Sequence, residues 1–172
     1  MEKKIILTGL CFWSTEAIFQ RIKGVSFTQC GYYNIENFDF AWQKEDLLES
    51  VLIHYNEDEI SLSSILDLYL LTHNPALISW NIEECIYPLC RPAIFYFNES
   101  DLLVINNKCD LFKENTNEPF YTKTLQGDLS LFRKASEYDQ NFYNKKPSDG
   151  FSCANIAPKL EKVKNKYPDL LK

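Results

Sequence analysis

The sequence predicts an α/β or α+β sandwich that folds as a single domain over residues 1–172. Short apolar segments rich in β-branched residues alternate with segments whose apolar residues recur at helical spacing. Hydrophobic residues make up 45% of the 172 residues, which is enough for one full core. No repeat, low-complexity run or linker divides the sequence, so a second domain is not expected.

The first elements follow from the N-terminal residues. Residues 3–9, "KKIILTG", are apolar, β-branched and end at a glycine, which is typical of a buried strand. Residues 14–24 predict a helix with Ser14 or Thr15 as its N-cap and Gly24 at its end. Cys11 is therefore expected where a strand passes into a helix.

The rest of the chain continues the mixture of strands and helices. A long loop is expected at residues 73–90, and residues 98–120 fit either a helix or a strand. Strands are expected at residues 25–33, 49–56 and 91–97, and helices at residues 61–73, 136–145 and 157–167.

The composition argues against nucleic-acid binding and membrane insertion. The net charge is −6, from 24 acidic and 18 basic residues, whereas proteins that neutralise phosphates are usually basic. The lysines of residues 159–167, "KLEKVKNKY", are expected on the solvated face of a helix. No run approaches the roughly 20 apolar residues of a membrane span, and no signal peptide is apparent. We expect a cytoplasmic monomer whose six cysteines are thiols and include no CxxC pair.

Cys11 is the candidate nucleophile. Backbone N–H groups at a helix N-terminus favour negative charge, so they lower the pKa of a thiol placed there. The alternative is a buried and inert cysteine, which is common. Phe12 and Trp13 follow directly and fit either the core or an apolar cup for a small uncharged group such as a methyl.

Glu49 is the candidate general acid. Strand alternation places it on the same face as Val51, Ile53 and Tyr55, which are apolar or aromatic. A carboxyl on such a face tends to hold its proton, as a general acid at neutral pH must. The alternative is a solvated position at the start of the strand.

The two histidines give little support for a metal or a protease. His54 and His73 lie far apart in the sequence, and no cysteine pair has the spacing of zinc ligands. No protease signature accompanies Cys11, and no glycine-rich loop could cradle a phosphate.

Four segments in order resemble the A-type peptide methionine sulfoxide reductases. They are "GLCFWSTEAIFQRIKGVSFTQCGYY", "ESVLIHYNEDEISLSSILDLYLLTHNPA", "RPAIFYF" and "ASEYDQNFYNKKPSDGFSCANIAPKLEKVKNKYPDLLK". The Cys-Phe-Trp element carries most of the specificity. The resemblance implies a ferredoxin-like two-layer α+β sandwich and reduction of the S-epimer of methionine sulfoxide, free or in oxidised proteins.

The resemblance also implies roles for individual residues. Cys11 would attack the sulfoxide sulfur, Phe12 and Trp13 would hold the methyl group, and Glu49 would protonate the departing oxygen. Cys11 would become a sulfenic acid and condense with a resolving thiol, for which Cys153 matches the usual position. Thioredoxin or another dithiol would restore the pair, and no other cofactor would be needed. Two more cysteines remain open as resolving thiols: Cys85 and Cys90.

The sequence departs from the family pattern around the sulfoxide oxygen. The tyrosine expected before the glutamate has no match, since Phe38 and Phe40 lie nearest. Cys90 stands where a second oxygen-binding tyrosine is usual, and Asp139 stands where a histidine is usual. Three tyrosines are candidates to replace the lost donors: Tyr32, Tyr33 and Tyr87. Two other functions are considered, a degenerate homologue that binds oxidised methionine and a thiol sensor.

Overall fold

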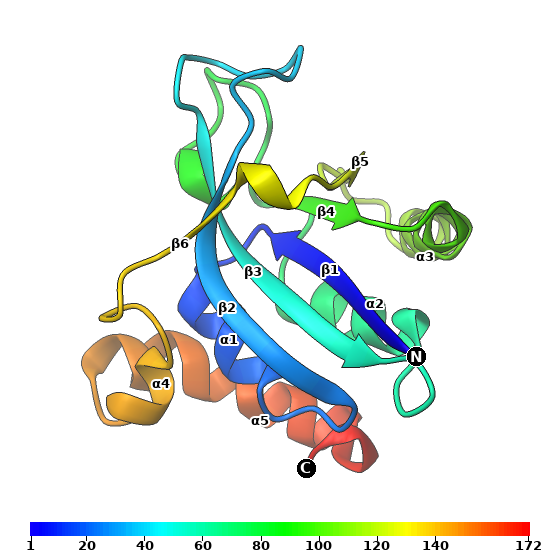
Figure 1. Ribbon diagram of the computed structural model, residues 1–172, viewed down its shortest axis with the longest axis vertical. Helices are drawn as coiled ribbons and strands as arrows, with labels where there is room; N and C mark the ends of the chain where they lie inside the picture. The colour runs from blue at the N-terminus through cyan, green and yellow to red at the C-terminus, as the bar shows by residue number, and fades with distance from the viewer.

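A six-stranded sheet forms the centre of the protein in the computed structural model, which describes residues 1–172 (Figure 1). The strand order is β5-β4-β1-β3-β2-β6, and every pair is antiparallel except β4–β5, which is parallel. The strands are β1 (Glu2–Thr8), β2 (Val25–Asn34), β3 (Leu47–Asn56), β4 (Ala93–Tyr96), β5 (Lys123–Gln126) and β6 (Phe132–Lys134).

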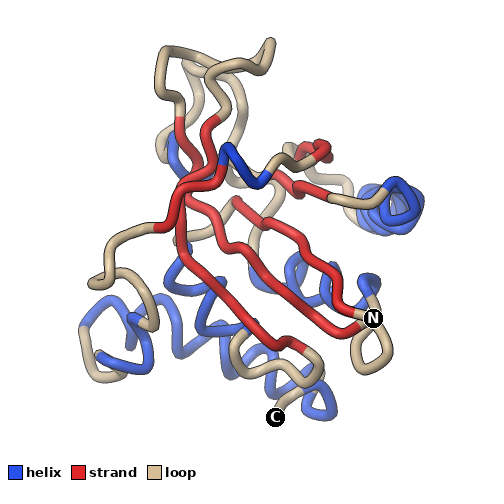
Figure 2. The backbone as a smooth tube through the Cα atoms, in the orientation of Figure 1, coloured by secondary structure: helices blue, strands red, loops and turns tan.

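Five α-helices and four short helical turns connect the strands (Figure 2). The α-helices are α1 (Phe12–Phe19), α2 (Leu62–Thr72), α3 (Glu99–Asn115), α4 (Phe142–Lys145) and α5 (Ala157–Lys166). The short turns are η1 (Pro88–Cys90), η2 (Leu129–Leu131), η3 (Ser152–Ile156) and η4 (Pro168–Leu170). None of the helices combines the length and the apolar character needed to cross a membrane.

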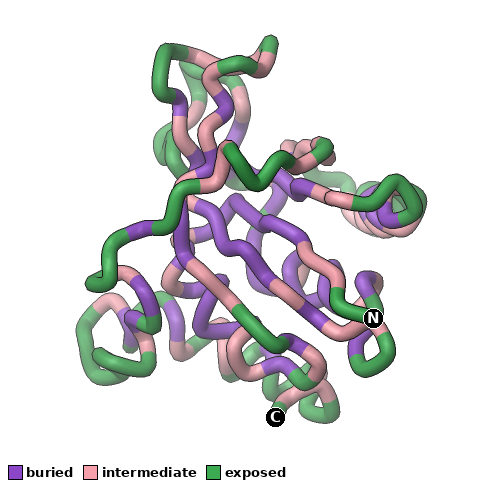
Figure 3. Tube along the Cα trace, viewed as in Figure 1, coloured by how far each residue is buried: buried purple, intermediate pink, exposed green.

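The two faces of the sheet are covered differently. Ile5, Val51 and Ile53 point to one face, where α1, α2, α3 and α5 pack over the largest core cluster. Ile6 and Leu52 point to the other face, where loop aromatics cover a smaller core cluster. The central strands are buried along most of their length (Figure 3). The predicted two-layer α+β sandwich is therefore confirmed.

Helix α1 begins earlier than predicted. It starts at Phe12, directly after Cys11, and ends at Phe19. Ser14 and Thr15 are buried inside the helix and do not cap it. The chain can turn this early because Gly9 adopts a φ of +103°, a conformation that other residues rarely adopt.

Residues 136–145 form much less helix than predicted. Only α4, the last four residues of this stretch, is helical. The residue before it, Asn141, adopts a left-handed φ of 56°, which interrupts any helix from Ser136 onward. The ambiguous stretch after residue 98 is helical and forms α3, while β5 and β6 had no predicted counterpart.

Candidate functional site

Cys11 lies at the N-terminus of α1, where the chain leaves β1. Its carbonyl accepts hydrogen bonds from the backbone N–H groups of Ser14 at 3.0 Å and Thr15 at 3.3 Å. Gly9 is needed close by, because a Cβ at that position would lie 2.8 Å from the Cβ of Pro92. The strand-to-helix position predicted for Cys11 is confirmed, and its side chain is half-buried.

Glu49 faces Cys11 from β3. Its Oε2 accepts a hydrogen bond from the Phe12 backbone N–H at 3.3 Å, which ties the carboxyl to the first turn of α1. Burial raises the pKa of Glu49, and the charge of Asp139 raises it further. Hydrogen bonds from the Phe12 N–H and the Cys11 thiol lower this pKa and only partly offset the increase. The alternative of a solvated Glu49 at the edge of the sheet is therefore excluded.

The pKa of Cys11 is raised, whereas its position at a helix N-terminus predicted a lowered pKa. Burial and the charge of Glu49 together raise the pKa of Cys11 to about 12. The backbone N–H groups of Trp13 and Ser14 lower it, as a helix N-terminus should, but their effect is smaller. The thiol becomes a better nucleophile when Glu49 carries a proton, because the opposing negative charge is then gone.

An aromatic cup stands beside this pair. Phe12 is 3% exposed and packs against Trp13, with 6.2 Å between the ring centroids. Trp13 stacks on Phe142 at 3.8 Å, and its Nε1–H donates a hydrogen bond to Asp139 at 3.2 Å. Both rings are therefore held in place by their neighbours.

Tyr32 is the tyrosine that reaches this site. It is the cross-strand partner of Glu49 in the β2–β3 ladder, and its ring centroid lies 5.5 Å from that of Phe12. Burial raises the pKa of Tyr32, and the charges of Asp139 and Glu49 add to this effect. Tyr33 points to the opposite face, where its hydroxyl accepts the Asp128 N–H, and Tyr87 is exposed.

Lys159 is a site residue that the sequence interpretation missed. The other lysines of the C-terminal helix are exposed, as predicted, but Lys159 in the first turn of α5 is half-buried. Burial lowers the pKa of Lys159, and charges on Cys11 and Cys90 raise it, so the ammonium interacts electrostatically with both thiols. A cation in the first turn opposes the helix dipole, and this unfavourable position was the available signal.

The cysteines occupy three different environments. Cys30 and Cys109 are buried, Cys11, Cys85 and Cys90 are half-buried, and Cys153 is exposed in η3. The role of Cys153 as resolving thiol stays a prediction.

The histidines serve other purposes. His73 is buried, stacks on Tyr69 and has a pKa lowered to about 4 by burial. Its ring nitrogens contact the Tyr69 carbonyl and the Thr122 hydroxyl, so its role is structural. The Nδ1 atom of His54 lies 3.6 Å from Oε1 of Glu2. No group of three His, Cys, Asp or Glu side chains is placed to hold a metal ion.

A thiol that faces a half-buried carboxyl beside an aromatic cup is the site of a thiol-dependent oxidoreductase. The family model "Peptide methionine sulfoxide reductase" matches residues 3–170. The chain belongs to the peptide methionine sulfoxide reductase family.

One relative supports this family assignment, and two solved structures share the fold. The peptide methionine sulfoxide reductase MsrA of Campylobacter jejuni strain RM1221 is 35% identical over 95% of this chain and 99% of its own. Reduced Mxr1 from Saccharomyces cerevisiae superposes with a TM-score of 0.71 at 21% identity, covering 90% of this chain and 91% of its own. Mxr1 in complex with Trx2 superposes with a TM-score of 0.55 at 18% identity, covering 82% and 84% of the two chains.

Proposed function

We propose that the protein reduces the S-epimer of methionine sulfoxide and that Cys11 takes up the oxygen. The observation that carries this proposal is the contact of Cys11, Glu49 and the first turn of α1 beside the aromatic cup. A binding module needs neither a nucleophile nor a half-buried acid.

The chemical step transfers one oxygen atom from the sulfur of the substrate to the sulfur of Cys11. The reactive form has the proton on Glu49 and the negative charge on Cys11, and it arises from the thiol and carboxylate by internal proton transfer. Cys11 attacks the sulfoxide sulfur while Glu49 protonates the oxygen. The substrate sulfur gains two electrons and leaves as a thioether, and Cys11 loses two electrons and becomes a sulfenic acid.

Substrate binding divides between apolar and polar contacts. Phe12 and Trp13 contact the methyl group, because an apolar group is favoured beside aromatic rings over water. Tyr32 donates a hydrogen bond to the sulfoxide oxygen from the side of Glu49. This single hydroxyl takes the place of the donors that the family pattern puts elsewhere.

A second thiol of the chain then condenses with the sulfenic acid, and a thioredoxin-type dithiol reduces the resulting disulfide. The solved complex of the similar chain Mxr1 with Trx2 supports an external partner of this kind. All six cysteines are free thiols, which suits a reducing compartment such as the cytoplasm. We propose that the protein works there as a monomer on free or peptidyl sulfoxide.

A single turnover without added reductant tests the proposed reaction. Reduced protein is mixed with excess S-epimer of a blocked methionine sulfoxide, and released methionine and lost thiols are counted. We expect about one methionine per chain for the S-epimer, none for the R-epimer and none for Cys11→Ser. Sulfoxide binding without methionine release would indicate a reader of oxidised methionine. A peroxide-driven disulfide without methionine release would indicate a thiol sensor.

A further inference from the structure

The loop between α2 and β4 turns two thiols inward. Eight of the ten residues from 81 to 90 are exposed, and the two exceptions are Cys85 and Cys90. Exposed neighbours include Ile82, Ile86 and Leu89, which are apolar. The two cysteines are thus the most buried of residues 81–90, although the larger apolar side chains of this stretch are exposed.

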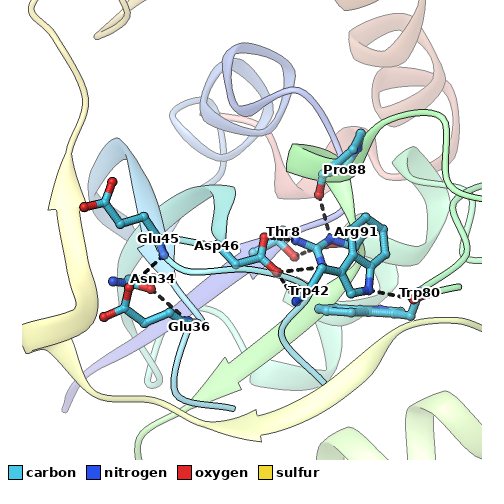
Figure 4. Close-up of polar contacts among 9 residues, drawn as sticks. All are labelled: Thr8, Asn34, Glu36, Trp42, Glu45, Asp46, Trp80, Pro88 and Arg91. Atoms are coloured by element: carbon cyan, nitrogen blue, oxygen red, sulfur yellow. Dashed lines mark hydrogen bonds and ion pairs between the residues drawn. The ribbon is translucent and has the colours of Figure 1, made fainter. Parts of the chain in front are cut away.

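Cys90 is held beside the strand that carries Glu49. It ends η1, which packs against β3. The next residue, Arg91, is 0% exposed, and its Nε donates a hydrogen bond to the Pro88 carbonyl of η1 at 2.7 Å (Figure 4). Both terminal nitrogens of Arg91 donate hydrogen bonds to the carboxylate of Asp46, which lies directly before β3. The η1 turn is therefore fixed against the first residues of β3.

Two indole rings complete this attachment. The guanidinium carbon of Arg91 lies 3.9 Å from the ring centroid of Trp42 and 4.9 Å from that of Trp80. A stacked guanidinium that donates three hydrogen bonds has little freedom to move. Cys90 directly precedes this rigid residue, so its position relative to β3 is set by the fold.

The electrostatic surroundings of Cys90 agree with its position against β3. Burial raises the pKa of Cys90 to about 12, and negative charges on Glu49 and Cys11 contribute to the increase. Lys159 lowers the pKa of both Cys11 and Cys90. When Cys11 becomes a neutral sulfenic acid, its repulsion is lost and the thiolate of Cys90 forms more readily.

Cys153 is placed less favourably. It lies within η3, where its backbone N–H donates a hydrogen bond to the Asp149 carbonyl at 2.9 Å. Its thiol is exposed and lies 3.8 Å from the Pro147 carbonyl oxygen. A disulfide needs Cα atoms within about 7 Å and converging Cβ atoms, so an exposed thiol fixed in a helical turn must first be released from it.

We propose that Cys90 is the resolving thiol of this protein. The Cys90 thiolate attacks the sulfur of the Cys11 sulfenic acid, a Cys11–Cys90 disulfide forms, and the sulfenic oxygen leaves as water with a proton taken up from the site. A thioredoxin-type dithiol then reduces this disulfide. This assignment rests on the proposed function, because the sulfenic acid is the product of the first step.

The test is a single turnover followed by rapid acid quench, alkylation of free thiols and peptide mapping. In the natural protein, we expect about one methionine per chain, two thiols lost and a Cys11–Cys90 disulfide. Cys90→Ser should still release one methionine, which also shows that it is folded, but should lose one thiol only. Its sulfenic acid should persist and react with a 1,3-diketone probe.

Two matched variants make the result decisive. Cys85→Ser changes the other inward thiol of the same loop, and Cys153→Ser changes the position expected from the family pattern. Both should still lose two thiols per turnover. A disulfide between Cys11 and Cys153, or loss of two thiols in Cys90→Ser at the natural rate, would overturn the assignment. Absence of methionine release in the natural protein would instead refute the proposed function.

Discussion

Replacement of Glu49 by glutamine separates its chemical role from its structural role. The glutamine side chain has the same size, and its carbonyl oxygen can still accept the Phe12 N–H. It cannot deliver a proton to the sulfoxide oxygen. We therefore expect Glu49→Gln to bind sulfoxide and to release methionine far more slowly.

The size of this effect follows from the surroundings of Glu49. Positioned general acids contribute about 10²–10⁴-fold to a rate, or roughly 3–5 kcal/mol of barrier. The other carboxylate that acts on Glu49, Asp139, already accepts hydrogen bonds from Trp13 at 3.2 Å and Ser136 at 2.6 Å. Because no second acid is free beside Cys11, we expect a loss of about 10³-fold or more.

The assay is the single-turnover rate of methionine release under saturating S-epimer. Glu84→Gln is the control, since Glu84 is exposed on the loop that precedes η1 and should keep the full rate. If Glu49→Gln keeps a rate within threefold of the natural protein, the assignment of the proton donor is wrong.

Glu49→Gln should also change the thermal stability of the protein in a pH-dependent way. The raised pKa of Glu49 means that its stabilising contribution is full below the pKa of the unfolded chain, roughly 4.3, and is lost as the pH rises through the folded pKa. Glutamine does not ionise, so Glu49→Gln should unfold at a higher temperature than the natural protein at pH 7 and lose this advantage near pH 4. A lower melting temperature at pH 7 would contradict the raised pKa.

Three further predictions concern the surrounding residues. Tyr32→Phe should lower kcat/KM for the S-epimer about 10²–10³-fold, the usual effect of removing a donor from a developing oxyanion. Asp139→Asn removes a charge that raises the pKa of Glu49, so the limb of the pH–rate profile governed by Glu49 should move to lower pH. Asp46→Asn breaks the buried ion pair with Arg91 and should lower the free energy of unfolding by about 3–5 kcal/mol in urea titrations.

Each of these predictions has a control in the chain. Tyr33→Phe removes a hydroxyl on the opposite face of the sheet and should leave kcat/KM unchanged. Asp128→Asn is the exposed counterpart of Asp139→Asn and should leave the pH limb in place. Asp110→Asn removes an exposed pair with Lys113 and should change the free energy of unfolding by less than about 1 kcal/mol. Equal effects in a variant and its control would contradict the corresponding prediction.

The sequence predicted the central part of the site because local patterns determine it. Alternation along residues 49–56 places Glu49 on the core side of β3, and the strand-to-helix transition places Cys11 at the start of α1. Both features depend on residues within a few positions. The family resemblance supplied their roles, and the geometry agrees with the pairing of thiol and carboxyl.

Other features depended on contacts between distant parts of the chain. Lys159 and Cys90 reach Cys11 only after α5 and η1 have packed, so neither periodicity nor composition indicated their place. The raised pKa of Cys11 was missed for the same reason, since it depends on burial and on a charge from another strand. The helix expected from Ser136 failed because the left-handed backbone of Asn141 has no strong sequence signature.

The walls of the aromatic cup come from opposite ends of the polypeptide. Trp13 belongs to the first helix, whereas Asp139, which bonds to its indole N–H, comes 126 residues later, and Phe142 covers its ring. Domains are synthesised from the N-terminus, so Cys11 and Glu49 leave the ribosome long before Asp139 and Phe142 can hold Trp13. A nascent chain, or one shortened by a stop codon before residue 139, has Cys11 and Glu49 but lacks the groups that hold Trp13. We therefore expect reductase activity only from chains that extend past Phe142.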